Sequence, residues 1–546
     1  MQIKNVSIQN FRSIAHETID LREYITLIGP NNCGKSNIIS ALLFFYDYIN
    51  LKDTDFFCCP ECETCDVYVD VEFSETSDDL YNSLPEQYKL PGKRFKVRRQ
   101  SSKGDKPIYK GFTFKDGKEE LYDTDFFGAK GVGKGKIGDV IYIPALKDVV
   151  EELKTTGSAT MAKLLKEIVA PTILESEEYK AFSESVKSLS ERLRGEPVED
   201  PTKWNYKTIA GIEYFLNNEL TSWNCTVKLH LEPLDPAKLA QQTAALAIEE
   251  KGQVHLPVES KGQGLQRSLE VALVKLWAEV SRRKDREKIK EEKKKLFHPE
   301  FTLLLIEEPE AFQHPQQQYK FYEDLREIAA SENQQVVATT HSPYFLSSHT
   351  DDLSTIIKIA KKENKSYARC LSKEFLEKIT SREETKKFQY HLWLNPERNA
   401  MFFSDIVLLV EGQTEKVLLN WILQNVEGFT QAHRQKSFVM DCGGKFQIDK
   451  FMRLCEELEI SHLVIHDIDD EKKEFHKTAN QNIQKLANQY TKGILAVNPD
   501  IENRLGIAMP ERVSEKPLAI LEFLTNDANR NNPFLGELSE FLIKSI

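Results

Sequence analysis

Two groups of residues have the types and spacing that phosphate and metal chemistry require. Residues 29–36 read Gly-Pro-Asn-Asn-Cys-Gly-Lys-Ser, a glycine-rich loop that ends in a lysine and a hydroxyl. Much further along the chain, Glu411 and Glu415 follow one apolar stretch, and Asp467 and Asp469 follow another. A loop suited to phosphates and a set of carboxylates therefore indicate a nucleotide site followed by a divalent-metal site.

The loop matches G-x-x-x-x-G-K-S and stands between a strand predicted at 22–28 and a helix predicted at 35–49. Amides at such a helix N-terminus hold phosphates. We expect Lys35 to reach the β- and γ-phosphates of ATP and Ser36 to bind Mg²⁺. A chance glycine-rich turn is disfavoured by the flanking strand and helix. The loop residues predicted to contact ATP are Gly29, Asn31, Asn32, Gly34, Lys35, Ser36 and Asn37.

A second carboxylate segment completes this predicted site. The continuous apolar run 301–306 is typical of a strand buried on both faces, and Glu307 and Glu308 follow it. We expect Glu307 to complete the Mg²⁺ shell and Glu308 to polarise the attacking water. Glu307 stands where Asp is usual, and its longer side chain could slow hydrolysis. His341, after the next predicted strand, is a candidate γ-phosphate sensor, although a lone histidine is more often structural.

The later carboxylates are placed by strand ends. Glu411 ends an apolar strand predicted at 406–410, where ligands gather in open α/β sheets, and Glu415 falls on the same face of the next helix. Asp467 and Asp469 share one direction by the strand period of two. Acidic residues at strand ends are individually most often solvated surface. Four carboxylates around one point repel unless cations lie between them, and two divalent ions about 4 Å apart are usual for phosphodiester cleavage.

Four of the nine cysteines are crowded together. A shared zinc ion is one interpretation, because thiolates two residues apart can bind the same metal. The favoured alternative is a surface loop, since no second Cys/His pair follows at a suitable distance. The four residues are Cys58, Cys59, Cys62 and Cys65.

Bulk properties limit the class of protein. A chain of 546 residues predicts two to four domains. It has no run of eighteen apolar residues and no secretory signal at its start, so we expect a cytoplasmic protein that does not span a membrane. The net charge of −12 argues against non-specific binding of nucleic acid over the whole surface, while local basic patches could still bind it.

The remaining pattern is that of α/β domains with a helical region between them. Strands are predicted at 2–10, 66–73, 139–144, 335–339 and 462–466, and a hairpin at 92–115. Residues 148–222 are helical without visible chemistry, and dimerisation or lever work are the default roles. Residues 261–295 begin as a helix and become a charged run, either a solvated helix face or a DNA-binding arm. The main boundary is predicted near 396.

The order of the nucleotide-site segments resembles the ABC-type ATPases of the SMC/RecF group. The strand leading into Asn10-Phe11-Arg12 is typical of that group, and Ser260-Lys-Gly-Gln-Gly264 stands where its signature segment covers the nucleotide of a second subunit. The resemblance adds Arg12, Ser260, Gly262 and Gly264 to the ATP site. It also implies that ATP joins two heads into a dimer.

The second carboxylate pattern resembles the TOPRIM domain of topoisomerases, primases and certain nucleases. The resemblance makes Glu411 the acid/base candidate, and Asp467 and Asp469 the metal ligands, with Glu415 beside them. Asn-Pro-Asp-Ile-Glu at 498–502 resembles a segment that gives such nucleases another ligand, here Glu502. Lys516 matches a later lysine that could steady the pentavalent phosphorane.

Together the two halves resemble the OLD (overcoming lysogenisation defect) family, including nucleases of the Gabija system and of retrons. The implied α/β architecture is an ABC-type ATPase head at 1–147 and 223–395, a helical insertion at 148–222, and a TOPRIM domain at 396–546. The family implies ATP-regulated cleavage of DNA with Mg²⁺ or Mn²⁺ in bacterial anti-phage defence. It also implies a homodimer or homotetramer, with a helicase or a retron reverse transcriptase as partner.

Two other functions use the same features. A repair ATPase could clamp DNA with a TOPRIM-like half that binds without cutting. A topoisomerase would need a nucleophilic tyrosine on a DNA-gripping domain, and a primase would add a zinc ribbon and a polymerising core. Glu307 and the weak signature segment lead to the hypothesis that ATP regulates more than it drives.

Overall fold

The structure is a computed structural model of the 546-residue chain. It divides into two compact units, residues 1–145 with 292–546, and residues 146–291. The continuous described stretches are 1–57, 66–128, 136–145, 176–196, 207–219, 256–269, 301–346, 352–371, 396–469, 472–508 and 512–546, with isolated positions between some of them.

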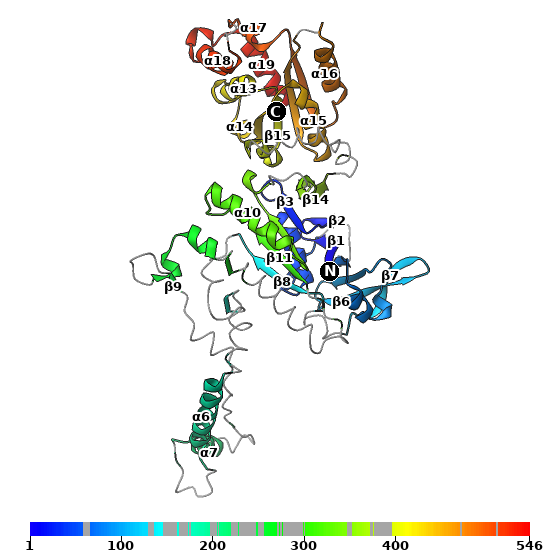
Figure 1. Ribbon diagram of the computed structural model, residues 1–546, viewed down its shortest axis with the longest axis vertical. Coiled ribbons are helices and arrows are strands. Elements are labelled where there is room, and N and C mark those ends of the chain that lie inside the picture. Colours follow the sequence, from blue (N-terminus) through cyan, green and yellow to red (C-terminus); the bar gives the residue numbers. More distant parts are fainter. Residues whose placement is uncertain are drawn as a thin grey trace. The chain divides into compact units, whose positions relative to one another are not determined.

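An antiparallel sheet begins the first unit (Figure 1). Inward-facing residues alternate with outward-facing ones along most of β1, and its buried face packs into the core that also contains helix α1 (Lys35–Phe45). The strand order is β2-β1-β4-β5-β6-β7, and a short helix α2 (Asp78–Ser83) follows β4. The strands are β1 Gln2–Phe11, β2 Ile14–Asp20, β4 Val67–Ser74, β5 Phe95–Ser101, β6 Ile108–Lys115 and β7 Lys118–Asp125.

A second sheet carries the glycine-rich loop. Its order is β14-β13-β3-β12-β11-β8, parallel except for β14, and most residues of β3, β11 and β12 are buried. Apolar side chains on both faces explain the continuous hydrophobic runs. Helix α10 (Pro315–Ala329) connects β11 to β12. The strands are β3 Tyr24–Ile28, β8 Asp139–Ile143, β11 Thr302–Glu307, β12 Gln334–Thr339, β13 Ile356–Lys362 and β14 Lys365–Cys370.

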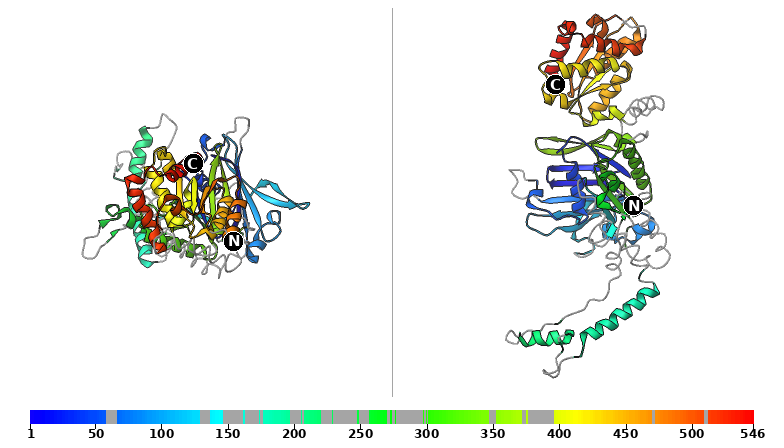
Figure 2. Two further views of the ribbon diagram at one scale, coloured as in Figure 1. Left: turned by 90° about the horizontal axis from the view of Figure 1, so that it is seen from above. Right: turned by 90° about the vertical axis from the view of Figure 1, so that its left-hand side faces the viewer.

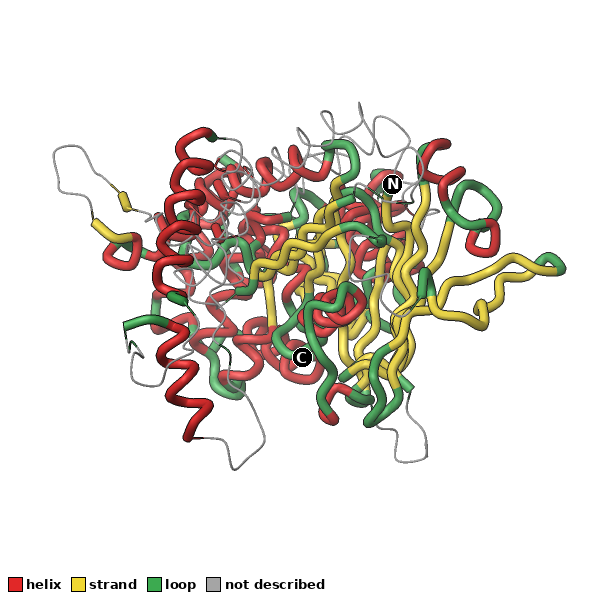
Figure 3. Tube along the Cα trace, turned by 90° about the horizontal axis from the view of Figure 1, so that it is seen from below, coloured by secondary structure: helices red, strands yellow, loops and turns green. Residues whose placement is uncertain are grey.

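The third sheet of this unit is parallel, with the order β16-β15-β17-β18. Figure 3 shows the strands of the chain in yellow and its helices in red. Its strands are β15 Ile406–Val410, β16 Ser437–Asp441, β17 Ser461–Asp467 and β18 Thr491–Val497. The helices are α13 Gln413–Asn425, α14 Gln431–Lys436, α15 Lys445–Glu457, α16 Glu474–Lys485, α17 Ile501–Leu505, α18 Lys516–Thr525 and α19 Pro533–Ser545.

The second unit contains the helices α6 (Glu177–Arg194) and α7 (Ile209–Glu219), both inside the region predicted to be helical (Figure 2). It also contains the short strands β9 (Ala247–Ile248) and β10 (Leu256–Pro257). Within the described parts of the chain, no helix is both long and apolar enough to cross a membrane. Cys58, Cys59, Cys62 and Cys65, and most of the charged run ending at 295, lie outside the described residues.

The strands predicted from the sequence are confirmed, with ends shifted by one or two residues. Two expectations were wrong. The helix after the glycine-rich loop ends at Phe45 and not at 49, because the chain leaves helical geometry at Tyr46. The segment from 340 to 395, in which no strand was predicted, contains β13 and β14, which continue the second sheet next to β3. The strands β2, β7, β16 and β18 were not predicted individually.

Candidate functional site

The glycine-rich loop is shaped by two glycines that no other residue could replace without strain. Gly29 and Gly34 have φ angles of 141° and 112°. A Cβ on Gly29 would lie 2.1 Å from the Ile359 carbonyl oxygen, and one on Gly34 would lie 2.3 Å from the Ser366 hydroxyl. Both angles fall in the region that favours glycine. Strands β13 and β14 therefore press against the loop and fix its path.

Lys35 begins helix α1 and is 7% exposed. Its Nζ donates hydrogen bonds of 2.9 Å to the carbonyl oxygens of Gly29 and Pro30. Burial lowers the pKa of this lysine, which the nearby carboxylates oppose. The ammonium thus spans the loop and would exchange these carbonyls for phosphate oxygens when a nucleotide binds.

The predicted magnesium ligands of this site are brought together. Ser36 and Tyr142 form side-chain hydrogen bonds with Glu307. Burial raises the pKa of Glu307 above its ordinary value, against those two bonds. A hydroxyl beside a carboxylate at the end of a parallel strand, next to the loop, is a donor set that suits Mg²⁺.

Glu308 and His341 also meet, since β11 and β12 are parallel neighbours and their carboxyl ends lie at one edge. The His341 Nε2 lies 3.8 Å from Glu308 Oε1. Burial lowers the pKa of His341, which favours a neutral ring. Glu310, which the sequence analysis did not assign, accepts 2.6 Å and 3.1 Å bonds from the amides of His341 and Ser342.

Of the other predicted ATP residues, some are hydrogen-bonded beside helix α1 and others are exposed on the loop. Arg12 is held at 2.8 Å by both Asp55 and the Ser40 hydroxyl, beside the first turns of α1. The Asn37 amide donates to Ser13 Oγ at 2.6 Å. Asn31 and Asn32 are exposed on the loop.

Ser260, Gly262 and Gly264 belong to the second unit, at the start of a helix over 263–269. The amides of Leu265 and Gln266 donate to the Gly262 carbonyl oxygen, and the Ser260 hydroxyl donates to Pro257. Nothing within 4 Å would meet a Cβ on Gly262. The backbone at Gly262, just before this helix, is therefore uncovered in the described part of the chain.

The acidic residues of the third sheet gather at the carboxyl ends of β15 and β17, which are adjacent parallel strands. The Glu411 carboxylate accepts the Asp467 amide at 2.8 Å, and Glu415 accepts the Gly412 amide at 2.9 Å. Asp467 itself accepts the amide of Ile501 at 3.1 Å. These bonds tie two strands and two helix starts to one point.

The same point is electrostatically crowded. Burial raises the pKa of Asp467 to about 9, and the charges of Glu411, Glu415, Glu502 and Asp469 add to this rise. Burial likewise raises the pKa of Glu411 to about 7 and that of Glu415 above its ordinary value. Like charges in a low dielectric disfavour simultaneous ionisation, and a divalent cation among them reverses that preference.

The donor set fits a cation but is not preassembled around one. Among the residues that the structure describes, no three His, Cys, Asp or Glu side chains already stand in ligand geometry. In each of the five carboxylates one oxygen is engaged by a backbone amide or by a lysine. Glu502, 2% exposed, has Oε1 at 2.7 Å from Lys516 Nζ, and its buried Oε2 has no hydrogen-bond partner among the described residues. Such an orphaned carboxylate oxygen aimed into an acidic cluster suits a metal ligand.

Lys445 is the functional residue that the sequence analysis missed. It starts α15 after Gly443 and Gly444 and is 4% exposed. Its Nζ donates to the backbone oxygens of Asp467 and Ile468 and lies 3.0 Å from Asp469 Oδ2. The signal was Cys-Gly-Gly-Lys directly after the end of β16 at Asp441, since a lysine at the start of the next helix lies at the same sheet edge as the carboxylates.

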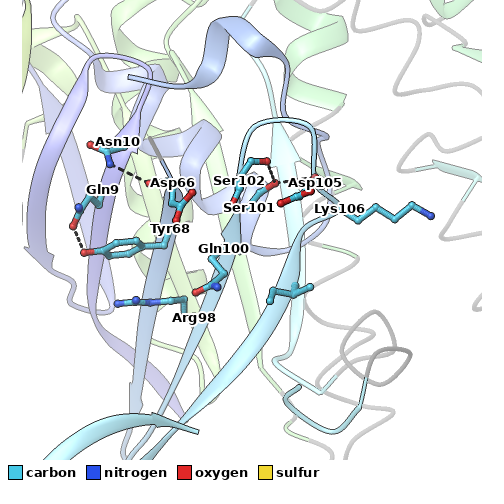
Figure 4. Close-up of a pocket in the computed structure, with 11 residues that line it drawn as sticks. Gln9, Asn10, Asp66, Tyr68, Arg98, Gln100, Ser101, Ser102, Asp105 and Lys106 are labelled. Atoms are coloured by element: carbon cyan, nitrogen blue, oxygen red, sulfur yellow. Dashed lines mark hydrogen bonds between the residues drawn. The ribbon is translucent and has the colours of Figure 1, made fainter. Parts of the chain in front are cut away.

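A hollow on the antiparallel sheet lies apart from this chemistry (Figure 4). Tyr68 and Arg98 line it, and none of the predicted ATP or metal residues does. The Arg98 guanidinium is paired with Asp70 at 2.6 Å and lies over the Tyr68 ring. Its charge is therefore already compensated, and we assign no ligand to this hollow.

Comparison with known proteins matches both halves. Residues 1–82 and 78–346 match the family described as "AAA ATPase domain". Residues 402–469 match the family described as "Overcoming lysogenization defect protein-like, TOPRIM domain". The matched segment contains Glu411, Glu415, Asp467 and Asp469.

Several curated proteins are similar over most of the chain. The "Old nuclease" of Escherichia phage P2 is 26% identical over 487 residues, covering 86% of this chain and 77% of that protein. The "OLD nuclease" of Thermus scotoductus is 22% identical, covering 96% and 94%. An "Endonuclease GajA" of Bacillus cereus is 22% identical, covering 98% and 87%.

Proposed function

Since this chain belongs to the OLD family, with an AAA-type ATPase domain followed by an OLD-like TOPRIM domain, we propose that it is an ATP-regulated endonuclease that cuts DNA. Its similarity to proteins named nuclease and endonuclease over most of its length supports this function. The two domains imply the use of a nucleotide and of divalent metal. We propose that the metal is Mg²⁺ or Mn²⁺ and that two ions bind in the TOPRIM half.

In the ATPase half, Lys35 and the loop amides bind the β- and γ-phosphates. Ser36 and Glu307, which share a hydrogen bond, would hold Mg²⁺. Glu308 orients the attacking water and His341, beside it, senses the γ-phosphate. The remaining ATP contacts in the proposal are Arg12, Gly29, Asn31, Asn32, Gly34 and Asn37, with Ser260, Gly262 and Gly264 covering the nucleotide of a second subunit.

In the TOPRIM half, Glu411, Glu415, Asp467, Asp469 and Glu502 would hold the divalent ions. When bound, such ions polarise the phosphodiester and neutralise developing charge. Glu411 is the proposed acid/base residue, since its carboxylate accepts the Asp467 amide at the edge where the ions would be held.

In this proposal Lys516 contacts the phosphorane. Its Nζ is 2.7 Å from Glu502 Oε1. Burial acts to lower the pKa of this lysine, but the hydrogen bond and charge of Glu502 raise it above its ordinary value, so the side chain stays charged.

The single observation that carries the proposal is the convergence of buried carboxylates on Asp467, with a pKa of about 9 from burial and from four acidic neighbours. A cluster whose charges cannot coexist in the absence of a cation favours metal binding over a surface role.

The test uses the full-length protein and supercoiled plasmid with Mg²⁺ or Mn²⁺. We expect nicking, a loss of about a hundredfold or more in Asp467→Ala because several kcal/mol of metal stabilisation disappear, and retained nicking in Lys35→Ala. Glu456→Gln, an exposed carboxylate on α15, is the matched control and should cut normally. Nicking that survives Asp467→Ala would refute the assignment, and a wild type that binds DNA and never cuts it would favour the clamping ATPase.

We further propose that ATP acts as a regulator, since Glu307 replaces the usual Asp. A turnover above about ten ATP per second, near a typical enzyme rate, would contradict this. The proposal also includes a bacterial cytoplasmic defence role, a homodimer or homotetramer built on 148–222, and a helicase or reverse-transcriptase partner. Light scattering of the full-length chain, with and without ATP, tests the oligomer.

A further inference from the structure

Two phenylalanines next to the carboxylate cluster are turned toward solvent. Phe446 on α15 and Phe475 on α16 are 49% and 54% exposed, and their ring centroids lie 5.9 Å apart. The two helices pack side by side (Figure 1). Burying a phenylalanine is worth about 1.5–3 kcal/mol, so two adjacent exposed rings forgo a substantial stabilisation. Such a patch indicates a binding surface.

His476 joins the two rings into one aromatic platform, defined here as Phe446, Phe475 and His476. The imidazole lies 4.4 Å from the Phe475 ring centroid and 5.9 Å from that of Phe446, and it is stacked on the latter with an interplanar angle of 29°. Three π-systems in contact, two of them half exposed, offer flat faces to a planar ligand.

The aromatic platform is connected directly to the carboxylate cluster. The His476 Nδ1 lies 3.3 Å from Asp469 Oδ2. Lys445, which precedes Phe446 in the chain, places its Nζ 3.0 Å from the same oxygen. A ligand on the platform therefore lies beside the residues proposed to hold the metal ions.

The platform borders a groove of about 570 Å³ between α15 and α16, and Ala479 and Ile483 are among the residues that line it. Asp449 and Glu474 are the acidic side chains that line the groove, and Lys445 is the lysine that lines it. Exposed aromatic faces are the surfaces on which unpaired bases stack, whatever their sequence.

We propose that the aromatic platform stacks an unpaired base of the DNA next to the bond that is cut. This inference rests on the proposed function and specifies its substrate. In a fully paired duplex both faces of each base are covered by neighbouring base pairs, so only an unpaired base can offer a face to Phe446 or Phe475. The preferred substrate class is therefore DNA with unpaired bases, such as a bubble, a flap or a frayed end.

The first test measures stacking without cleavage. A duplex with a bubble that contains one 2-aminopurine is titrated with full-length protein in Ca²⁺. We expect the fluorescence to be quenched on binding, and the affinity to be about five- to a hundredfold weaker in Phe446→Leu and Phe475→Leu, because leucine keeps apolar area and lacks the π-face. Phe475→Trp keeps an aromatic face and should therefore bind with wild-type affinity. Phe114→Leu, a 44% exposed ring on β6, is the matched control and should bind like wild type.

The second test compares cleavage of the bubble with cleavage of the same sequence fully paired, in Mg²⁺ or Mn²⁺. The wild type should prefer the bubble, and both leucine variants should lose that preference. Equal binding and cleavage of the two substrates by wild type and variants would overturn the platform while leaving the nuclease intact. Failure of the wild type to cut either substrate would instead overturn the proposed function, and the fluorescence titration would still decide the stacking.

A protein partner is the other occupant that an exposed aromatic patch could have. Leucine variants that change the oligomeric mass in light scattering, with unchanged 2-aminopurine quenching, would assign the platform to contact between copies of the chain. That outcome would also reject base stacking.

Discussion

At the residue scale, Asp467 combines burial with a position between other acids. It is 8% exposed, and burial is the largest cause of its raised pKa. The pKa is raised further by four negative charges, those of Glu411, Glu415, Glu502 and Asp469. Burial raises the pKa values of its neighbours Glu411 and Glu415, and the amides of Asp467 and Gly412 oppose this rise without removing the repulsion. The residual repulsion is the property that a divalent ion would relieve.

This repulsion predicts how the stability of the metal-free protein depends on pH. Asp467 has a folded-state pKa of about 9, above the unfolded value of about 4. The folded state therefore binds more protons than the unfolded state between these values, and stability decreases as the pH rises through that window. Thermal melts in EDTA from pH 5 to pH 9 should show the decrease, and Asp467→Asn should flatten it.

Adding Mg²⁺ or Mn²⁺ at pH 8 should raise the melting temperature of the wild type, because the ion binds the folded state. The exposed substitution Glu456→Gln should change neither curve. A wild-type stability that rises steadily with pH in EDTA would contradict the buried acidic cluster.

Lys445 leads to a second prediction at this scale. It is the buried cation nearest to Asp469 and also holds the backbone after β17 through Asp467 and Ile468. Lys445→Met should destabilise the protein by about 1.5–3 kcal/mol, the usual value of hydrogen bonds to a charged group, because Lys445 is buried while Asp469 is partly exposed, and it should lower metal-dependent cleavage. Urea unfolding and plasmid nicking measure the two effects.

The matched control is Lys450→Met on the same helix, whose Nζ donates to Gln447 Oε1 at 3.2 Å. It should be nearly neutral in both assays. Equal losses in the two variants would show that any lysine on α15 matters and that the contact to Asp469 does not.

At the element scale, the hairpin of β13 and β14 supports the glycine-rich loop. The Ser366 hydroxyl on β14 donates to the Cys33 carbonyl oxygen at 2.6 Å and also contacts Ser13 Oγ at 2.6 Å. The Gly34 Cα has no room for a Cβ because of the same serine. The loop conformation thus depends on a strand more than 300 residues away in the chain.

We therefore expect Ser366→Ala to weaken ATP binding several-fold and to cost about 1 kcal/mol of stability, the typical value of one hydrogen bond. Titration with a fluorescent ATP analogue and thermal melting check the two effects. Ser331→Ala, whose exposed hydroxyl bonds only within the end of α10, is the control. An unchanged ATP affinity in Ser366→Ala would show that the glycines alone hold the loop.

At the scale of the whole first unit, one hydrophobic cluster reaches both sites. It includes Ile28, the residue before Gly29, and Val407 and Leu409 on β15, the strand that ends before Glu411. Lys358 on β13 crosses the same region, and its Nζ donates to the Leu458 carbonyl oxygen at 3.2 Å. Burial lowers the pKa of this lysine to about 8. Packed interiors transmit shifts because they resist compression.

This connection predicts that Lys358→Met weakens the effect of ATP on DNA cleavage and leaves ATP binding and basal cleavage in place. Methionine fills similar space, and replacing a buried charge by an apolar side chain of similar volume is often nearly neutral for stability. Plasmid nicking with and without ATP gives the ratio to compare. Lys361→Met, an exposed lysine on the same strand, should keep the full ATP response.

The sequence by itself determined the features that depend on local order. The loop from Gly29 to Ser36, the carboxylates after 301–306, and the pair Asp467 and Asp469 each follow a buried strand, and apolar runs reveal such strands. Parallel strands bring their carboxyl ends to one edge, so the meeting of Glu411 with Asp467 followed from the pattern.

Only the tertiary structure decided which partners surround those residues. Lys445 contacts Asp469, and Phe446 contacts Phe475, although each pair comes from different elements. Ser366 packs against Gly34 from a strand far away in the chain. Hydrophobic periodicity reports which face of one element is buried and carries no information on what covers it. The β13–β14 hairpin was missed for the same reason: β13 becomes a strand by pairing with β3 and β14 by pairing with β13, while the sequence of β14 is mixed.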